Sequence, residues 1–166
     1  MSRVIGVDPG TATTGWGLVE TIASGHQLSL VAYGAITTRA NTPLPQRLQK
    51  IYAGLSDLVA KWQPDAAAVE ELFFSKNAKT ALAVGHGRGV VLLALANAGL
   101  SVAEYKPLEV KQAITGYGGA DKRQMQSMVQ MLLDLDDIPH PDDAADALAV
   151  AICHLHSARW LDRLTG

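Results

Sequence analysis

Short apolar runs and longer amphipathic stretches follow one another along this chain, and their order predicts its secondary structure. Apolar runs bounded by turn residues predict strands at 4–8, 15–19, 28–36, 66–70 and 101–105. Apolar residues at helical spacing predict helices at 48–61, 75–98, 108–114, 121–134 and 142–160. Ser75 is the expected N-cap of the second helix, and Gly99 is expected to end it.

The order of these elements predicts the fold class. Three strands in hairpin order are followed by alternating helices and strands, which is typical of an α/β domain with a five-stranded mixed sheet and helices on its faces. The last helix is apolar on nearly every side at its centre, so we expect it to lie flat on the sheet. At 166 residues the chain is expected to form a single domain, 1–166.

Small residues form a stripe on the second predicted helix. Ala81, Gly85 and Gly89 recur every four residues and therefore share one helix face. Because glycine in a helix costs up to about 1 kcal/mol relative to alanine, the stripe predicts a tight crossing. The partner is either another part of the core or a second subunit.

Composition indicates the class of protein and the cellular compartment in which it works. Hydrophobic residues make up 48% and charged residues 18% of the chain, as in a globular domain. Cys153 is the single cysteine and lies in an apolar run, so it is interpreted as a core residue in a reducing compartment. No apolar run reaches the roughly 20 residues of a membrane span, and the first residues lead directly into a strand without a signal peptide. We therefore expect a cytoplasmic protein that does not bind membranes.

Four carboxylates stand at the ends of predicted elements. Asp8 ends the first strand, Glu70 ends the fourth, and Asp143 and Asp146 share a face at the start of the last helix. If the first and fourth strands are neighbours, all four approach one sheet edge, where ionised carboxylates need a shared cation. Oxygen ligands without cysteine or histidine favour Mg²⁺ or Mn²⁺, and two such ions can hydrolyse a phosphodiester.

Each of these acids also has a structural interpretation. Asp8 suits the cap of a Pro-Gly turn, and Glu70 with its neighbour Glu71 suits a solvated surface. Asp143 and Asp146 suit the N-terminus of a helix, whose dipole favours acidic side chains. The four acids together favour the metal site over these alternatives.

Basic and aromatic residues near the acids predict contacts with phosphate and bases. The net charge of −2 argues against a nucleic-acid ligand, but carboxylates that bind metal contribute to that value. Lys111 and Lys122 bracket the glycine-rich segment 116–119, and Arg123 follows, which makes a local basic patch. Phe73 and Phe74 follow Glu70 and Glu71, and one of the two is a candidate for stacking on DNA bases. The alternative for the basic residues is an ordinary solvated surface, and the alternative for the phenylalanine is a position in the core.

These motifs, taken in order, resemble the RuvC-type Holliday-junction resolvases over nearly the whole chain. The resemblance rests on Gly6-Val7-Asp8-Pro9-Gly10 with Thr14-Gly15-Trp16-Gly17, on Ala68-Val69-Glu70-Glu71-Leu72-Phe73, on Gly85-His86-Gly87-Arg88-Gly89, and on Asp143-Ala144-Ala145-Asp146-Ala147-Leu148-Ala149. The opening turn alone has little specificity, whereas the ordered set is highly specific.

The resemblance implies a ribonuclease-H-like fold and a homodimer that cuts four-way DNA junctions. Each subunit would nick one of two strands of like polarity and leave 5′-phosphate and 3′-hydroxyl ends, in recombination and DNA repair. Two Mg²⁺ ions per subunit, replaceable by Mn²⁺, would bind to the catalytic acids Asp8, Glu70, Asp143 and Asp146. Lys111, Lys122, Arg123 and Phe73 would contact DNA, and the RuvA–RuvB branch-migration complex would be the protein partner.

Three other functions are compatible with parts of the sequence. Asp8-Pro9-Gly10-Thr11 also resembles the phosphate loop of actin-like ATPases and sugar kinases, but 166 residues leave no room for their second lobe. A ribonuclease that acts on RNA would need the same acids. A junction-binding module without catalytic activity would not need all four of them.

Overall fold

The computed structural model describes residues 1–22, 27–71 and 77–165. Five strands and five helices follow one another in the predicted order. In chain order they are β1 (Arg3–Asp8), β2 (Thr13–Ile22), β3 (Gln27–Thr37), α1 (Leu44–Trp62), β4 (Ala66–Glu70), α2 (Ala78–Asn97), β5 (Val102–Tyr105), α3 (Pro107–Thr115), α4 (Lys122–Leu132) and α5 (Asp142–Thr165).

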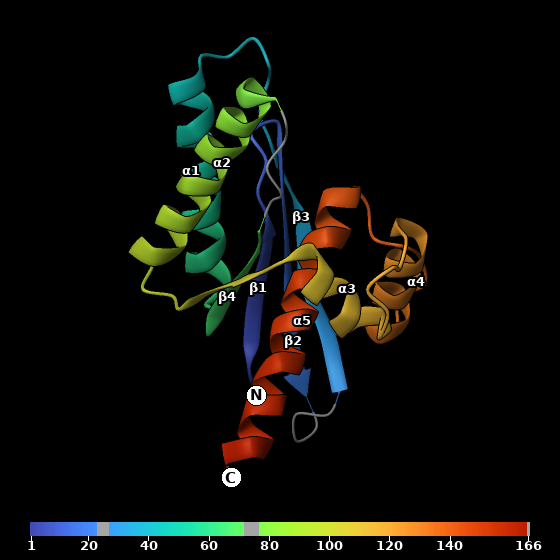
Figure 1. Cartoon of the computed structure of the whole chain (residues 1–166). Coiled ribbons are helices and arrows are strands. Elements are labelled where there is room, and N and C mark those ends of the chain that lie inside the picture. The colour runs from blue at the N-terminus through green and yellow to red at the C-terminus, as the bar shows by residue number, and fades with distance from the viewer. Residues whose placement is uncertain (23–26, 72–76, 166) are drawn as a thin grey trace.

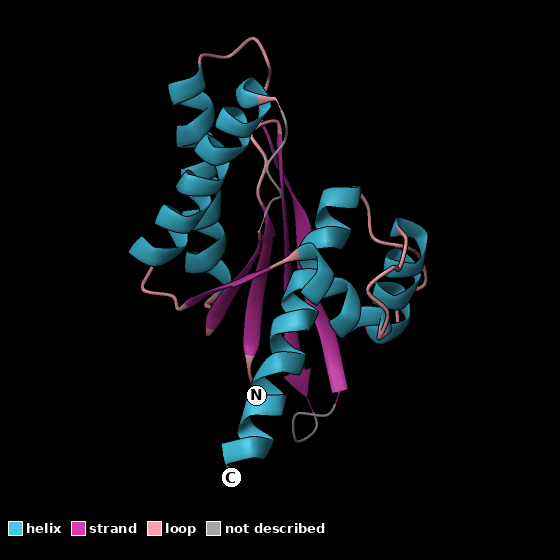
Figure 2. Ribbon diagram, viewed as in Figure 1, coloured by secondary structure: helices cyan, strands magenta, loops and turns pink. Residues whose placement is uncertain are grey.

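The strands form one mixed sheet with the order β3-β2-β1-β4-β5. β1, β2 and β3 are antiparallel neighbours, whereas β4 runs parallel to β1 and β5 runs parallel to β4. Figure 1 shows α1 and α2 on one face of this sheet and α5, with α3 and α4 beside it, on the other. Figure 2 shows the same three layers by secondary structure. The predicted five-stranded mixed sheet with helices on its faces is confirmed.

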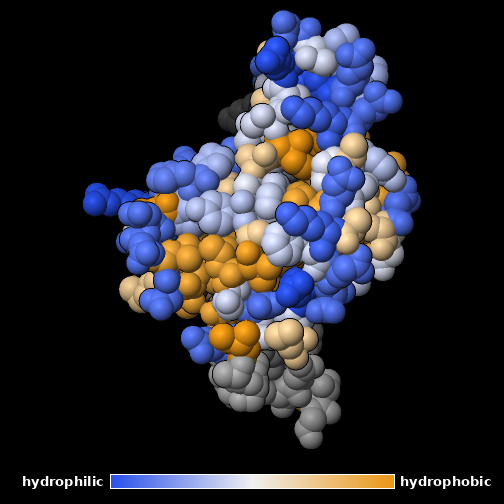
Figure 3. All heavy atoms as spheres, turned by 180° about the vertical axis from the view of Figure 1, so that it is seen from behind, coloured by the Kyte–Doolittle hydropathy of each residue, from blue (hydrophilic) through white to orange (hydrophobic). Residues whose placement is uncertain are grey.

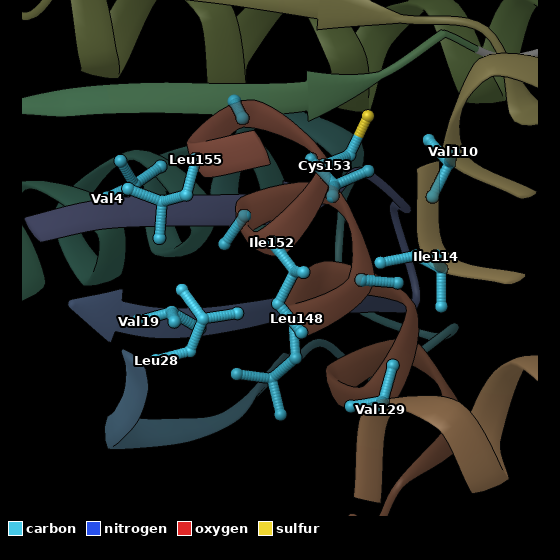
Figure 4. Close-up of a cluster of buried hydrophobic side chains, with 14 of the residues drawn as sticks. Val4, Val19, Leu28, Val110, Ile114, Val129, Leu148, Ile152, Cys153 and Leu155 are labelled. Carbon is cyan, nitrogen blue, oxygen red and sulfur yellow. The ribbon is translucent and has the colours of Figure 1, made fainter. Parts of the chain in front are cut away.

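Each face of the sheet has its own hydrophobic core. Beneath α5, the side chains of Leu148 and Ile152 pack with Val4 and Val19 from the strands, and α3 and α4 close this core from the side (Figure 4). Beneath α1 and α2, Ile5 and other strand residues pack with apolar helix residues. Cys153 is 1% exposed, which confirms that it is a core residue. Because α5 lies on the sheet along its buried length, the start of this helix has a fixed position over β1.

Three helices differ from their predicted bounds by three residues or more at one end. α1 begins at Leu44 instead of 48, because Pro45 lies in the first turn, where proline costs no hydrogen bond. α2 begins at Ala78, and the side chain of Asn77 caps it by accepting from the Lys79 N–H. Ser75, the predicted cap, lies outside the described residues. The helix begins after Asn77, so Asn77 is its cap in place of Ser75. α5 continues beyond 160 to Thr165.

α2 has one buried and one exposed face. By length and composition alone it is long and apolar enough to cross a membrane, and 22% of that window is buried. Its buried residues Gly87, Val91, Ala94 and Leu95 pack into the core under α1 and α2. A helix that contributes one face to a protein core passes the same composition test.

The exposed face of α2 carries the small-residue stripe. A Cβ added at Gly85 or Gly89 would meet nothing within 4 Å, so the predicted tight crossing does not occur within the described part of the chain. Leu82 and Leu93 lie on the same face and are 64% and 53% exposed. The alternative that remains for a tight crossing is a second subunit.

The edge strand β3 is less covered than the centre of the sheet. Most of its residues are half-buried, although α1 and α5 both contact this strand. Seen from behind, a contiguous apolar area remains at the surface between more polar regions (Figure 3). The best-packed part of the sheet is therefore its centre, where β1 and β4 end at the candidate site.

Candidate active site

Three carboxylates from opposite ends of the sequence meet at the end of β1. Asp8 is the last residue of β1, and Asp143 and Asp146 lie on the first turns of α5. One oxygen of each carboxylate lies within 4.8 Å of the others. The structure thus brings together three of the four acids that the sequence singled out, in a group able to hold a metal ion.

Glycines allow α5 to approach the sheet this closely. Gly15 is the register partner of Asp8 on β2, and a Cβ on Gly15 would overlap the carbonyl oxygen of Asp143. A Cβ on Gly6 would overlap the carbonyl oxygen of Ala147 one turn further along the helix. The missing side chains let the helix backbone rest on the strand backbone, and this contact carries Asp143 and Asp146 to Asp8.

The Gly15→Ala substitution is therefore expected to damage both the fold and the site. The new methyl group must push α5 away from β2, which should lower the free energy of unfolding by about 2–3 kcal/mol. Since the displaced segment carries Asp143, metal affinity should fall as well. Urea unfolding and Mn²⁺ titration would measure both effects. A variant as stable as the wild type, with unchanged Mn²⁺ affinity, would contradict this role of Gly15.

Glu70 enters the same region from the neighbouring strand. β4 pairs with β1 up to Val69 opposite Val7, so Glu70 and Asp8 each follow the last pair at the same sheet edge. Glu70 is not part of the close group of three acids. It lines a groove of about 230 Å³ together with Asp146, Lys111 and Lys122. Two of the four candidate acids, Glu70 and Asp146, therefore face one common space with the two predicted DNA-binding lysines.

The acids raise one another's pKa. Asp8 is 9% exposed, and its burial, followed by repulsion from Asp146, Glu70 and Asp143, raises its pKa to about 8. Burial and repulsion from Asp146 raise the pKa of Glu70 to about 7, although Lys111 opposes the rise. Burial also raises the pKa of Asp146, which Lys122 opposes. A cluster that resists ionisation in this way is stabilised by any positive charge placed among its oxygens.

The chemistry of the donors indicates which cations fit. The three grouped residues offer carboxylate oxygens, and the described part of the chain places no cysteine or histidine in that group. Hard oxygen ligands suit Mg²⁺, Mn²⁺ or Ca²⁺ better than zinc. The residues present therefore fit a hard divalent cation.

Arg88 holds the strand that carries Glu70. From α2 its guanidinium donates through Nη1 to the carbonyl oxygen of Glu70 (2.7 Å) and also pairs with Glu104 on β5. This fixes the end of β4 against both α2 and β5. The sequence places Arg88 in a glycine-rich motif but does not indicate this role. The signal that pointed to it is a lone arginine in the glycine-rich, otherwise apolar middle of a helix that borders the core.

Asp142 shows that adjacent acids on α5 have different surroundings. Its carboxylate pairs with Lys122 (2.8 Å) and accepts from the Gln126 side chain (3.1 Å), which ties the start of α4 to the start of α5. Hydrogen bonding and attraction to Lys122 lower the pKa of Asp142. Asp142 therefore positions Lys122 at the groove but lies outside the group of three acids.

The remaining predicted DNA contacts are not part of this groove. Arg123 lines an adjacent groove, although it follows Lys122 directly in the sequence. Phe73 lies outside the described residues. Of the basic and aromatic candidates, Lys111 and Lys122 are thus the two that the structure places beside the acids.

Comparison with known proteins identifies the relatives of this chain. The family model for crossover junction endodeoxyribonuclease RuvC matches residues 4–154. A protein of that name from Chloroflexus aurantiacus is 62% identical over 161 residues, which cover 97% of each chain. Thermus thermophilus RuvC, solved in complex with a Holliday junction substrate, superposes with a TM-score of 0.91 at 36% identity and covers 96% of each chain.

A more distant structure supports the fold alone. A yeast mitochondrial Holliday junction resolvase superposes with a TM-score of 0.72 at 14% identity, and covers 98% of this chain and 81% of that one. Together with the strand order, these neighbours confirm the ribonuclease-H-like fold predicted from the sequence.

Proposed function

Because this chain belongs to the RuvC family of crossover junction endodeoxyribonucleases, we propose that it resolves four-way DNA junctions by metal-dependent nicking of two strands of like polarity. The observation that carries the proposal is the meeting of Asp8, Asp143 and Asp146 beside a groove that also holds two lysines. Such an arrangement suits hydrolysis of a phosphodiester and not mere binding, because binding alone needs no buried acids.

The acids and the lysines have complementary roles in the proposed reaction. Asp8, Glu70, Asp143 and Asp146 would hold two Mg²⁺ ions per subunit, which Mn²⁺ can replace. When bound, these ions would lower the pKa of the attacking water and stabilise the leaving 3′-oxygen. Lys111 and Lys122 would hold the scissile phosphate over the acids, and the products would carry 5′-phosphate and 3′-hydroxyl ends.

The proposal is tested by comparing the cleavage of DNA substrates that differ in shape. Labelled four-way junctions and linear duplexes of the same sequence are incubated with the purified protein and Mg²⁺. We expect paired symmetric nicks in the junction and little cutting of the duplex. Equal cutting of duplex, of RNA or of an RNA–DNA hybrid would contradict junction selectivity. Binding without cutting in Mg²⁺ and Mn²⁺ would indicate a junction-binding module.

Paired nicking requires two active sites, and the exposed face of α2 is the surface we propose for a homodimer. Leu82 and Leu93 extend the glycine stripe into an apolar strip, and Gly85 and Gly89 leave room for the backbone of a second helix. A symmetric pair of such strips would bury these leucines. The RuvA–RuvB complex is the proposed partner of the dimer in recombination and repair, and the cytoplasm is its proposed location.

Leu93→Glu should convert this dimer into a monomer. A charge buried at this end of the strip would have no partner, so association should become undetectable at micromolar concentrations in light scattering after size-exclusion chromatography. Met131→Glu is the matched control, since Met131 is 70% exposed on α4. A Leu93→Glu protein that remains dimeric would place the interface elsewhere.

A further inference from the structure

A second groove lies beside the candidate active site and has no role in the proposed chemistry. Its volume is about 460 Å³, within the usual range of ligand sites, and Tyr117, Arg123 and Ser127 line it. Ala120 and Asp121 line both grooves. The two grooves are therefore neighbours that share one wall between α3 and α4.

Tyr117 is held in place while its side chain remains accessible. The hydroxyl of Thr115 accepts from the Tyr117 N–H (3.1 Å), and its single hydrogen is shared between the carbonyl oxygens of Lys111 (2.8 Å) and Tyr117 (2.9 Å), which ties the loop to the end of α3. The phenol end of the ring rests on Gly119, where an added Cβ would lie 2.5 Å from the tyrosine oxygen. Tyr117 is nevertheless 63% exposed. An aromatic side chain whose backbone is held and whose ring is largely exposed can serve as a platform for stacking.

The charges around the platform suit a nucleotide. Lys122 lines the first groove and the next residue, Arg123, lines the second, so cationic groups continue from one groove to the other. Asp121 is the acid closest to them in sequence, but its carboxylate accepts from the Gln124 N–H (2.8 Å) as the cap of α4. Aromatic side chains beside cationic ones are typical of surfaces that bind unpaired nucleotides.

We propose that this second groove binds a nucleotide of the cut strand adjacent to the scissile phosphate. Its base would stack on Tyr117, and its phosphate would contact Arg123. The inference rests on the proposed junction-cutting activity and adds a binding site to it. Tyr117 would act as a positioning residue that selects which phosphate lies over the acids, and so would contribute to the sequence preference of cleavage.

The test places the fluorescent base 2-aminopurine at successive positions around the cut and measures binding in EDTA. With the wild type, one position should change its fluorescence on binding. Tyr117→Phe should keep this signal, whereas Tyr117→Ala should lose it and bind the junction about tenfold more weakly. Arg123→Gln should reduce the slope of log affinity against log salt by about one. Tyr33→Ala, a change at an exposed tyrosine on β3, should alter neither measurement.

A single-stranded oligonucleotide carrying the same probe separates this inference from the proposed function. If the wild type shows no preference for junctions over duplex, the proposed function fails. Loss of the single-strand signal in Tyr117→Ala would still support the groove. If Tyr117→Ala matches the wild type in fluorescence, affinity and cleavage-site preference, the nucleotide site is overturned.

Discussion

Asp146→Asn is expected to reduce junction cleavage in Mg²⁺ by at least about a thousandfold while leaving junction binding intact. Asparagine preserves the shape of the side chain but removes the charge that would help to hold the metal beside Asp8 and Asp143. Metal ions stabilise the transition state by several kcal/mol, and each 1.4 kcal/mol corresponds to a factor of ten in rate. Binding measured in EDTA should be equal or slightly tighter, because one negative charge near the DNA is lost.

Two acids provide the controls for this experiment. Asp137→Asn makes the same chemical change at an exposed position and should cut like the wild type. Asp142 lies on the same helix, but Asp142→Asn removes the charged partner of Lys122. This variant should therefore change DNA affinity more than the cleavage rate at saturating DNA. If Asp146→Asn cuts as fast as Asp137→Asn, Asp146 merely stabilises the start of α5 and is not a ligand of the catalytic metal.

In the absence of divalent metal, the wild type should lose stability as the pH rises from about 5 to about 8.5. The folded protein holds protons on Asp8, with a pKa of about 8, and on Glu70, with a pKa of about 7. An unfolded chain releases these protons near pH 4. The stabilisation present at low pH therefore disappears as the pH rises through the folded-state values, and the total loss should amount to several kcal/mol. Mg²⁺ should restore it at the upper end.

Asp8→Asn isolates this effect from other titrating groups. Without the Asp8 carboxyl the cluster has less charge to repel, so the variant should be more stable than the wild type at pH 8.5 in EDTA. The two proteins should converge at pH 5. Urea unfolding at both pH values measures the difference, and other groups, such as the half-buried His154, cancel in it. A difference that does not change with pH would show that the Asp8 carboxyl is not protonated in the folded, metal-free protein.

The fold could be predicted because its signals are local. The apolar runs and their turn residues predicted all five strands, and the hairpin order implied the mixed sheet. Helix ends were less predictable, since the start of α1 depends on how a proline is accommodated and the start of α2 on which polar residue caps it. Whether the glycine stripe on α2 faced inward or outward could not be determined, because the composition of a helix does not show what lies beside it.

The meeting of three of the four acids was predictable from the sequence, whereas the contacts around them were not. Position at the ends of elements indicated Asp8, Asp143 and Asp146, and the structure groups them. The neighbouring Asp142 is the same type of residue, but its carboxylate pairs with Lys122 on α4 and not with the three grouped acids. This difference depends on the packing of α4 against α5. The hydrogen bond from the Arg88 guanidinium to the Glu70 carbonyl oxygen and the packing of α5 against Gly15 join segments that are distant in sequence. No local pattern reveals either contact.

The grouping of Asp8 with Asp143 and Asp146 also has a consequence for the synthesis of the protein. One acid lies on the first strand of the fold and the other two lie on its last helix. At about 5–20 residues per second, a ribosome that has made β1 needs many further seconds before α5 exists to complete the site. A nascent or prematurely terminated chain that lacks α5 therefore contains only one of the three grouped acids, and we expect such a chain to be inactive.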